Sequence, residues 1–383
     1  MAHATIVPLT GLRLPEDGSL LRDFTREEQH RDATYLDRYD RRTVFYDCQW
    51  RADLGRHVIH APTFLNLWEP FAAGLAAETG AVRIASRRPW KRSEQVLLDA
   101  PRDGLSVTLD GITHPIRSRA SERDRFAGLR LAITLNRNNR LDWIFDWATY
   151  HVRRHGMEAV AIADNDSTLY PLEDLRATLA AVEGLKQAVV YHAPFPYGPS
   201  GKRRRRGEKG AKFFQSGMLN VMRDDAAAAA RSVLSVDIDE LVLAPEGRTV
   251  FEMTERHPLG MLTFHGRWSY PARLDSGARP QREHVWRTVP SPKCHRKWCI
   301  VPTGIMGRRF LWDAHQIGGL AQNLFTTTRA VSHAHCRATT TNWRNDRFAL
   351  DTPLHRDADL AAALERYIGP PVAVSDGAEA SRS

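Results

Sequence analysis

The sequence predicts an α/β fold: a mostly parallel sheet with helices on both faces, plus a smaller β-rich region at the N-terminus. Two observations carry this prediction. Apolar runs alternate with helical patterns after residue 125, and polar clusters follow the ends of these runs. With 383 residues, the chain has room for two or three domains. We expect residues 1–125 to form the β-rich region, 126–350 the α/β domain, and 351–383 a terminal helix with a disordered tail.

Residues 1–125 contain short apolar runs between clusters of proline, glycine and charged residues, a pattern that favours short strands. The segment 105–113 alternates apolar and polar residues around Asp110-Gly111. This pattern is typical of a hairpin with a tight turn. The region gives no indication of its role.

Four buried strands are predicted from the apolar runs that follow. They lie at 129–135, 160–163, 188–191 and 233–236. Helices are predicted between them, at 141–155 with Gly156 as its C-cap, at 172–182, and at 213–231 through a run of alanines. Strands that alternate with helices at this spacing form parallel βαβ units. Two further strands are expected near 260–264 and 299–302.

The charge balance favours an anionic partner, because 54 Lys and Arg residues outnumber 45 Asp and Glu residues, giving a formal charge of +9. The segment 202–209 alone has six cationic residues and one glutamate. We expect it to be a mobile loop that contacts an anionic membrane surface or a lipid-phosphate-linked acceptor. We also expect a cytoplasmic protein that can lie peripherally at the inner membrane face. No apolar run reaches the ~20 residues of a membrane span, and residues 1–10 lack the pattern of a secretory signal. The four cysteines are expected to be reduced thiols.

In an open α/β sheet, ligands bind beyond the carboxyl ends of the strands. The sharpest motif there is Asp237-Ile238-Asp239, directly after the fourth strand. On an extended chain, both aspartates would point to the same side. Two adjacent carboxylates are most easily kept ionised by a hard divalent cation, so we expect Mg²⁺ or Mn²⁺ at this site.

Two other polar clusters follow the first and second strands, at 136–140 and 164–168. Both fit ordinary turns and helix caps. Their functional interpretation is contact with a nucleotide, through a carboxylate, through backbone N–H groups and through Arg137.

A histidine pair lies far downstream, at His333 and His335, and either residue could supply a nitrogen ligand to the same cation. With Cys294, His295 and Cys299 the pair could instead form a zinc site, although the cysteine spacing is not the usual one for zinc.

At these residues the sequence resembles GT-A glycosyltransferases, most closely those of the family 2 and family 92 type. The resemblance covers about residues 126–350. It rests on the stretch 131–170, which resembles the nucleotide-sugar half of that fold, and on 236–241, which resembles the family's Asp-x-Asp strand. His335-Cys336-Arg337 stands where such enzymes carry His-Tyr and then a basic residue, with cysteine in place of tyrosine.

The resemblance implies a metal-dependent transfer of a sugar from a nucleotide-diphosphate sugar to a hydroxyl of a saccharide, lipid-linked or small-molecule acceptor, with inversion, as in polysaccharide biosynthesis. It implies Mn²⁺ or Mg²⁺ as cofactor and no nucleic-acid partner. The implied metal ligands are Asp237, Asp239 and His335. The implied donor-binding residues are Thr134, Asn136, Arg137, Asn138, Asp164, Asn165, Ser167, Asp237 and Arg337. Lys297 is a further candidate for sharing the charge of the leaving group.

Inversion requires a general base for the acceptor hydroxyl, and the candidates are Asp313 and His315. Trp268 is a candidate for stacking on a sugar. Two other classes of function remain open. One is a metal-dependent phosphoesterase or nuclease that uses the same aspartates with the histidine pair. The other is a non-enzymatic nucleic-acid-binding protein led by the segment 202–209, although no recognition motif accompanies that charge.

Overall fold

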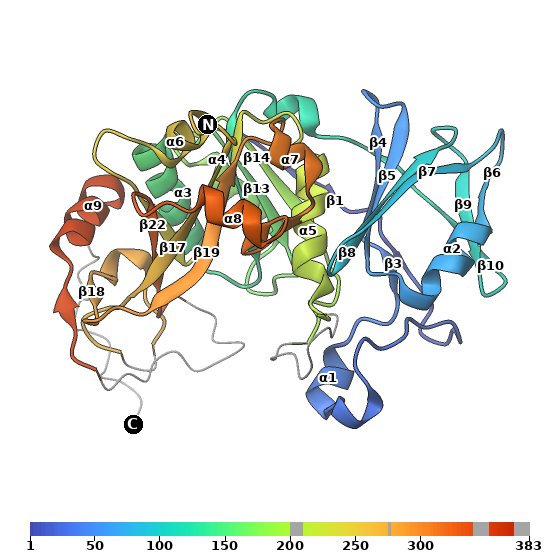
Figure 1. Cartoon of the computed structure of the whole chain (residues 1–383), viewed down its shortest axis with the longest axis horizontal. Helices are drawn as coiled ribbons and strands as arrows, with labels where there is room; N and C mark the ends of the chain where they lie inside the picture. Colours follow the sequence, from blue (N-terminus) through green and yellow to red (C-terminus); the bar gives the residue numbers. More distant parts are fainter. Residues whose placement is uncertain (200–209, 275–276, 340–351, 371–383) are drawn as a thin grey trace.

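The computed structural model describes residues 1–199, 210–274, 277–339 and 352–370. Within these residues the chain forms a β-rich module and a larger α/β body, seen side by side in Figure 1. The predicted fold class is therefore confirmed. The predicted basic loop at 202–209 and the tail after residue 370 lie outside the described residues.

In the described part of the chain, nine strands form the large sheet, in the order β1-β14-β13-β12-β15-β19-β17-β22-β16. The first five are parallel to one another, and antiparallel pairing begins where β15 meets β19. The strands are, in sheet order, β1 (His3–Pro8), β14 (Gln187–His192), β13 (Ala159–Asp164), β12 (Arg130–Asn136), β15 (Ser232–Ser235), β19 (Lys293–Ile300), β17 (Met261–Ser269), β22 (Ser332–Cys336) and β16 (Glu240–Leu243). The four predicted parallel strands are β12 to β15, and the two further expected strands fall in β17 and β19.

Helices cover both faces of this sheet because side chains alternate along each strand. On β13, Val160 and Ile162 belong to the core under α3 and α4, whereas Ala161 and Ala163 belong to the core under α5. The helices in the described residues are α1 (Ala33–Arg38), α2 (Trp68–Gly74), α3 (Leu141–His155), α4 (Leu172–Ala180), α5 (Phe213–Asp224), α6 (Val250–Glu255), α7 (Ile305–Arg309), α8 (Leu320–Thr326) and α9 (Ala358–Ile368). None of them is long and apolar enough to cross a membrane.

The boundaries of α3 match the prediction, whereas α5 matches at its start, Phe213, and not at its end. Gly156 ends α3 with φ of 67°, a left-handed conformation that glycine adopts without steric cost. The predicted helix through the alanine run instead ends at Asp224, and turns follow. The carboxylate of Asp225 is the cause, because it accepts hydrogen bonds from Ser121 and from the Tyr191 hydroxyl. These contacts outweigh the helix propensity of alanine.

The first strand also departs from the predicted domain boundary. Residues 3–8 were expected to belong to the N-terminal region, but β1 pairs in parallel with β14 and forms one edge of the large sheet. Along the sequence, the β-rich module is therefore inserted after the first strand of the body, whereas in space it lies to one side of the body (Figure 1).

The module has a core of its own, which includes Val44, Ile59, Phe64 and Val96. Its larger sheet contains β11 (Arg119–Ala120), β4 (Asp47–Arg51), β5 (Arg56–Pro62), β8 (Ser93–Asp99) and β7 (Arg83–Pro89), and its smaller sheet β10 (Ile112–Pro115), β9 (Leu105–Leu109) and β6 (Leu75–Ala77). The predicted hairpin is β9 and β10. Short two-stranded pairs are β2 (Leu12–Arg13) with β3 (Thr43–Phe45), β18 (Trp286–Arg287) with β23 (His355–Arg356), and β20 (Trp312–Asp313) with β21 (Gln316–Ile317).

A buried ionic network joins the module to the body. Arg119 of the module lies 2.7 Å from a carboxylate oxygen of Asp47 on β4 and 2.7 Å from one of Asp225 after α5. The Tyr191 hydroxyl on β14 donates to Asp225 at 2.8 Å. Because both carboxylates are fully buried, losing the arginine would leave two uncompensated charges inside the protein.

Two histidines of α3 hold β16, the strand that begins at Glu240. His151 Nδ1 lies 2.8 Å from the Trp147 carbonyl, and its Nε2 accepts from the Val242 amide. His155 Nε2 lies 2.8 Å from the Val242 carbonyl, and its Nδ1 accepts from the Val250 amide. Each ring uses one nitrogen as donor and the other as acceptor, so each must be neutral.

This arrangement predicts a loss of stability in mild acid. Burial lowers the pKa of His151 to about 4 and that of His155 well below its usual value. Unfolded histidines take up protons below pH ~6.5, so the free energy of unfolding should fall as the pH drops from ~6.5 towards 4, by up to roughly 3 kcal/mol per histidine. Urea unfolding at pH 7.5, 6.0 and 5.0 measures this. The double variant His151→Gln/His155→Gln should be less stable at pH 7.5 and less sensitive to pH; an equal pH slope in both proteins would contradict the prediction.

Candidate active site

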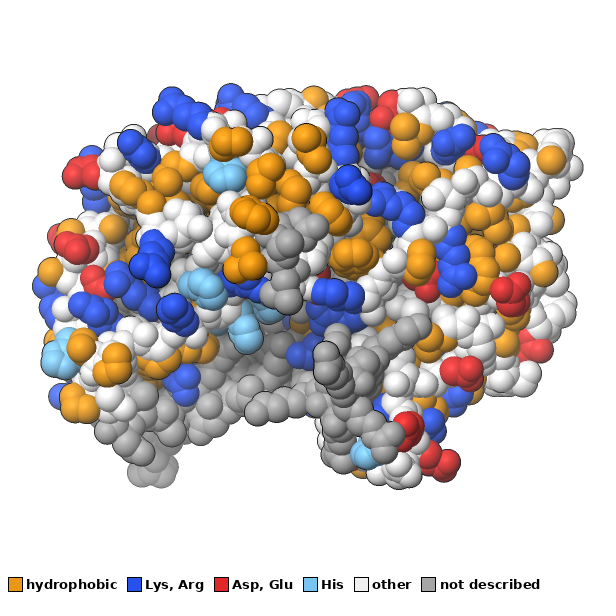
Figure 2. Space-filling view, viewed as in Figure 1, with side chains coloured by type: hydrophobic (Ala, Val, Ile, Leu, Met, Phe, Trp, Pro, Cys, Tyr) orange, Lys and Arg blue, Asp and Glu red, His pale blue; other side chains and the backbone are white. Residues whose placement is uncertain are grey.

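The carboxyl ends of the parallel strands meet at one edge of the sheet, as the sequence predicted. Asn136 at the end of β12 is the cross-strand neighbour of Asp164 at the end of β13, which is in turn the neighbour of His192 on β14. The turn after β15 brings Asp237 to the same edge. In Figure 2, histidine side chains gather around a hollow on the face shown.

Asp164 organises the loops at this edge through hydrogen bonds within the chain. Its carboxylate accepts from Asn136 Nδ2 at 2.6 Å and from the Ser167 hydroxyl at 2.7 Å. Asn136 also donates to the Tyr170 hydroxyl at 2.8 Å. Because Asp164 is fully buried, its role in the structure is to hold the two loops together rather than to present a free carboxylate.

The other predicted donor-binding residues surround that network. Asn138, with φ of 57°, accepts from the backbone amide of Thr168 at 2.7 Å and ties the first loop to the second. Arg137 is exposed and lies within hydrogen-bond reach of Asn165, whose amide donates to two backbone carbonyls after β14. Thr134 is buried below the loops, on β12. Of this group, Arg137 is thus the side chain most open to a ligand.

The predicted Asp-x-Asp motif lies in a turn, not on an extended strand. β15 ends at Ser235 and β16 begins at Glu240, and the Glu240 amide donates to the Asp237 carbonyl at 3.0 Å. The Glu240 carboxylate accepts from the Asp237 amide at 2.9 Å, which closes the turn. The turn still brings Asp237, Asp239 and Glu240 together, with ligand atoms within 4.8 Å of one another.

Strand pairing brings two histidines to this turn. Glu240 on β16 is the cross-strand neighbour of His335 on β22, and His333 comes two residues earlier on the same strand. His335 Nε2 lies 3.0 Å from Asp239, and His333 Nε2 lies 3.4 Å from Glu240. Gly266 makes room for the His333 ring, since a Cβ at that position would lie 2.1–2.4 Å from ring atoms.

A buried lysine completes the cluster. Lys297 on β19 lies 2.6 Å from a carboxylate oxygen of Asp237 and 2.8 Å from one of Glu240. Burial opposes ionisation of Glu240, but Lys297 and His333 outweigh it, so its pKa lies well below its usual value. Burial likewise opposes the charge on Lys297, yet the two carboxylates raise its pKa. Lys297 and Glu240 therefore form a buried ion pair, and Asp237 joins it from a side chain that is 42% exposed.

His335 lies against two acids. Burial would lower its pKa, but Asp239 and, to a lesser extent, Glu240 raise it to about 10. The pKa of His333 is lowered, chiefly by burial. A protonated imidazole has no lone pair for a metal ion, so a cation that binds His335 must displace its proton.

The donor set fits a hard divalent cation. The carboxylates of Asp237, Asp239 and Glu240 offer oxygen ligands, and His335 and His333 offer imidazole nitrogens in a group that shares Glu240. Nδ1 of the buried His333 ring has no hydrogen-bond partner among the described residues, while its Nε2 lies 3.4 Å from Glu240. The four cysteines are buried free thiols, and none belongs to a metal-ligating group in the described part of the chain, which gives no support to the zinc alternative.

Trp268 and Arg337 lie beside His335 in a stack. The Trp268 ring lies parallel to the His335 ring with centroids 4.1 Å apart, and the Arg337 guanidinium lies 5.3 Å from the Trp268 centroid. The predicted sugar-stacking side chain thus packs on a candidate metal ligand, with a cation above it.

The two predicted general bases, Asp313 and His315, have different surroundings in the structure. Asp313 is buried and ion-paired with Arg92 of the module. His315 stacks on His295 with centroids 4.7 Å apart, and its Nδ1 donates to the Arg296 carbonyl at 3.1 Å. Burial and the charge of Lys297 lower its pKa to about 3. Only His315 is thus linked electrostatically to the acidic cluster, as a neutral ring whose Nε2 is an acceptor.

The comparisons with known proteins found solved structures only. No family model and no curated protein matches the chain. Core-mannan synthase A from Aspergillus fumigatus, in its Mn/GDP form, is 12% identical over 38% of this chain and 43% of its own, with a TM-score of 0.24. S. aureus TarS is 15% identical over 40% and 23%, with a TM-score of 0.22. The mannosyltransferase PcManGT from Pyrobaculum calidifontis, in complex with GDP-Man and Mn²⁺, is 15% identical over 51% and 52%, with a TM-score of 0.25.

The chain thus spans between about a quarter and a half of the length of these structures. Because these TM-scores are low, the likeness to these structures does not indicate a function for this chain.

Two residues of the site, Glu240 and Tyr170, were not predicted from the sequence. Glu240 follows the Asp-x-Asp motif directly, and a third acidic residue at that place could have indicated it. Tyr170 carried no signal, since its role depends on loops that meet only in the folded chain. Lys297 was considered only for sharing charge with a leaving group, and the structure places it against two of the carboxylates.

Proposed function

We propose that this chain is a metal-dependent glycosyltransferase that moves a sugar from a nucleotide-diphosphate sugar to a hydroxyl of an acceptor. The observation that carries the proposal is the meeting of two features at one sheet edge. One is the carboxylate and histidine cluster around Asp239, and the other is the pair of polar loops held by Asp164. The negative charge of a diphosphate is balanced by a cation, and a nucleoside binds beside polar groups that can form hydrogen bonds with it.

In this proposal Asp237, Asp239 and His335 hold Mn²⁺ or Mg²⁺, with Glu240 beside them. The ion supplies Lewis-acid neutralisation of the charge that develops on the leaving nucleoside diphosphate. Lys297 keeps Asp237 and Glu240 ionised. Arg337 adds positive charge beside His335, and the loop of Asn136, Arg137 and Asn138 lies on the nucleoside side.

We propose inversion, with His315 rather than Asp313 as the base. In an inverting transfer the acceptor oxygen bonds to the anomeric carbon as the bond to the leaving diphosphate breaks, and the hydroxyl proton goes to a base. His315 Nε2 can accept that proton, because its Nδ1–H is used by the Arg296 carbonyl. Asp313 is neutralised by Arg92 and holds the module against the body.

The acceptor in this proposal is a saccharide, a lipid-linked molecule or another small molecule, as in polysaccharide biosynthesis. We place the protein in the cytoplasm, held to an anionic inner membrane face by the segment 202–209, which lies outside the described residues.

A thermal-shift screen of nucleoside diphosphates and nucleotide sugars, with and without Mn²⁺, tests the proposal. A ligand that binds only the native state stabilises it by roughly 2.7 kcal/mol at 100 times its Kd, so Tm should rise with ligand and Mn²⁺ together. Formation of glycoside rather than free sugar or phosphate separates transfer from hydrolysis by a phosphoesterase. A panel without any Tm response to a nucleoside diphosphate would refute the donor assignment.

A further inference from the structure

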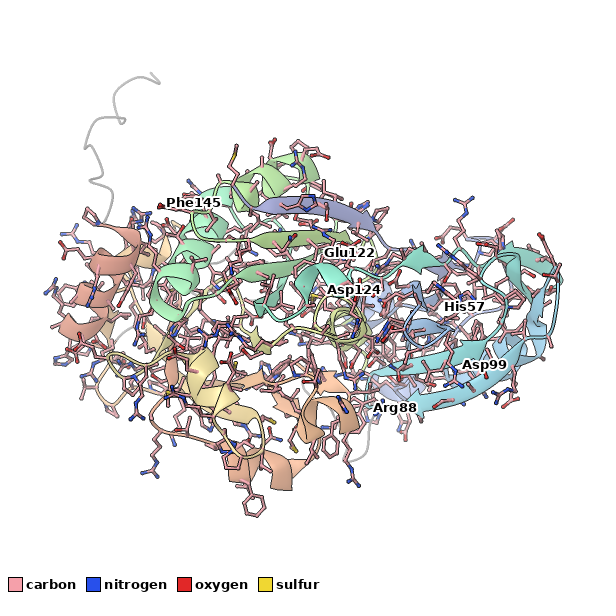
Figure 3. The ribbon with its side chains drawn as sticks, turned by 90° about the horizontal axis from the view of Figure 1, so that it is seen from above. His57, Arg88, Asp99, Glu122, Asp124 and Phe145 are labelled. Carbon is pink, nitrogen blue, oxygen red and sulfur yellow. The ribbon has the colours of Figure 1, made fainter. Side chains whose placement is uncertain are left out.

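A second polar cavity, of about 490 Å³, lies where the module meets the body. Its walls come from β4, β5, β7 and β8 of the module, and from the end of α5 and the start of α7 in the body. Figure 3 labels Arg88 at this seam, between the module and the orange segment of the body. α5 ends here and the chain then returns to the start of β15, so the cavity lies towards the amino ends of the parallel strands, away from the Asp237 turn.

Arginine dominates the lining. Five arginines face two aspartates in the cavity wall, and the arginines are Arg51, Arg88, Arg123, Arg223 and Arg308. The remaining lining is mostly aliphatic or small, which lowers the local dielectric and strengthens the unbalanced charge. The volume falls within the usual range of sites for small molecules.

The two aspartates are already used by the chain. Asp53 receives two hydrogen bonds from Arg51, at 2.8 and 2.7 Å. Asp224 pairs with Arg223 and also lies 3.1 Å from His60 Nε2. Arg123 lies 3.6 Å from Asp53 and 2.6 Å from Asp124, so three of the five arginines have a carboxylate partner.

Arg88 and Arg308 have no carboxylate partner among the described residues. Arg88 donates to the Arg309 carbonyl at 2.9 Å, and burial together with the charge of Arg223 lowers its pKa. Arg223 is 7% exposed, and its Nε is buried without a hydrogen-bond partner in the described structure. Together these features leave an excess of positive charge at the cavity, from Arg88 and Arg308.

We propose that this cavity binds a small phosphate-bearing anion. Guanidinium groups match phosphate oxygens in bidentate geometry. A phosphate group carries about two negative charges at neutral pH, whereas one carboxylate would offset only a single arginine. The proposal does not depend on the glycosyltransferase assignment, because it uses none of the residues at the Asp237 turn.

Calorimetric titration of the full chain with inorganic pyrophosphate, in buffer with a chelator, tests the proposal. Without a divalent cation the carboxylates of the candidate active site repel pyrophosphate, so its binding reports on the arginine cavity. We expect Arg88→Ala/Arg308→Ala to weaken binding at least tenfold. Arg308→Glu changes an exposed side chain, so it should fold normally and weaken binding to a similar degree.

A control variant assigns the signal. Arg176→Ala removes a partly exposed arginine on α4, away from the cavity. It should bind pyrophosphate as the unmodified protein does. Absence of binding, or equal affinity in Arg308→Glu and in Arg176→Ala, would overturn the proposal while leaving the proposed transferase function unaffected.

Discussion

Replacing Asp239 with asparagine should lower sugar transfer by roughly 100- to 1000-fold, the usual loss when one stabilising group of a transition state is removed. Asp239 belongs to the proposed metal site and lies 3.0 Å from His335, so the variant loses charge at the proposed cation while keeping nearly the same shape. The rate of nucleoside diphosphate release, measured with the donor that gives the largest thermal shift and with saturating Mn²⁺, is the readout.

The matched control for this prediction is Asp359→Asn, an exposed aspartate in the first turn of α9. It should leave the rate unchanged. Because Asp239→Asn also loses the ion pair with His335, the two rates are compared at a temperature well below the Tm of both variants. A rate for Asp239→Asn equal to that of Asp359→Asn would remove Asp239 from the site.

Replacing Lys297 with methionine should destabilise the protein by about 3–5 kcal/mol in metal-free buffer, the range found when one member of a buried ion pair is removed. Lys297 is 2% exposed and is the near neighbour of both Asp237 and Glu240, which would then repel each other. Adding Mn²⁺ should restore part of this loss, because a divalent cation then supplies the missing charge. Urea unfolding with a chelator and with Mn²⁺ measures both effects.

Lys293→Met is the matched control, since it changes an exposed lysine at the start of the same strand. Its stability should remain close to that of the unmodified protein in both buffers. If Lys297→Met were as stable as this control without metal, the carboxylates could not depend on the lysine for their charge. If Mn²⁺ restored nothing, the cation would not share those carboxylates.

The regular part of the fold could be predicted because its signals are local. Apolar runs marked β12 to β15, and Gly156 marked the end of α3. The place of β1 could not be predicted, because a short apolar run does not specify its partner, and pairing with β14 is decided in the folded state. The end of α5 depends on Asp225, whose partners Ser121 and Tyr191 are distant in the sequence.

For the candidate site, the sequence predicted which segments lie close together, but it did not predict their backbone conformation or the partners of their side chains. The clusters at Asn136, Asp164 and Asp237 do share one edge, because parallel strands bring their carboxyl ends together. The alternation assumed for Asp237 and Asp239 was wrong, because β15 stops before them. Asp313 was predicted as a candidate general base, and only tertiary packing reveals that its carboxylate is paired with Arg92.

The position of β1 bears on how the chain is made. The sheet edge cannot close until residues 187–192 have left the ribosome, whereas the module between, with its own core, needs only residues up to about 120. The first strand therefore remains unpaired while the module, which follows it in the sequence, can already fold. A tag fused before His3, or a truncation that removes these residues, would act on the assembly of the body rather than on the module beside it.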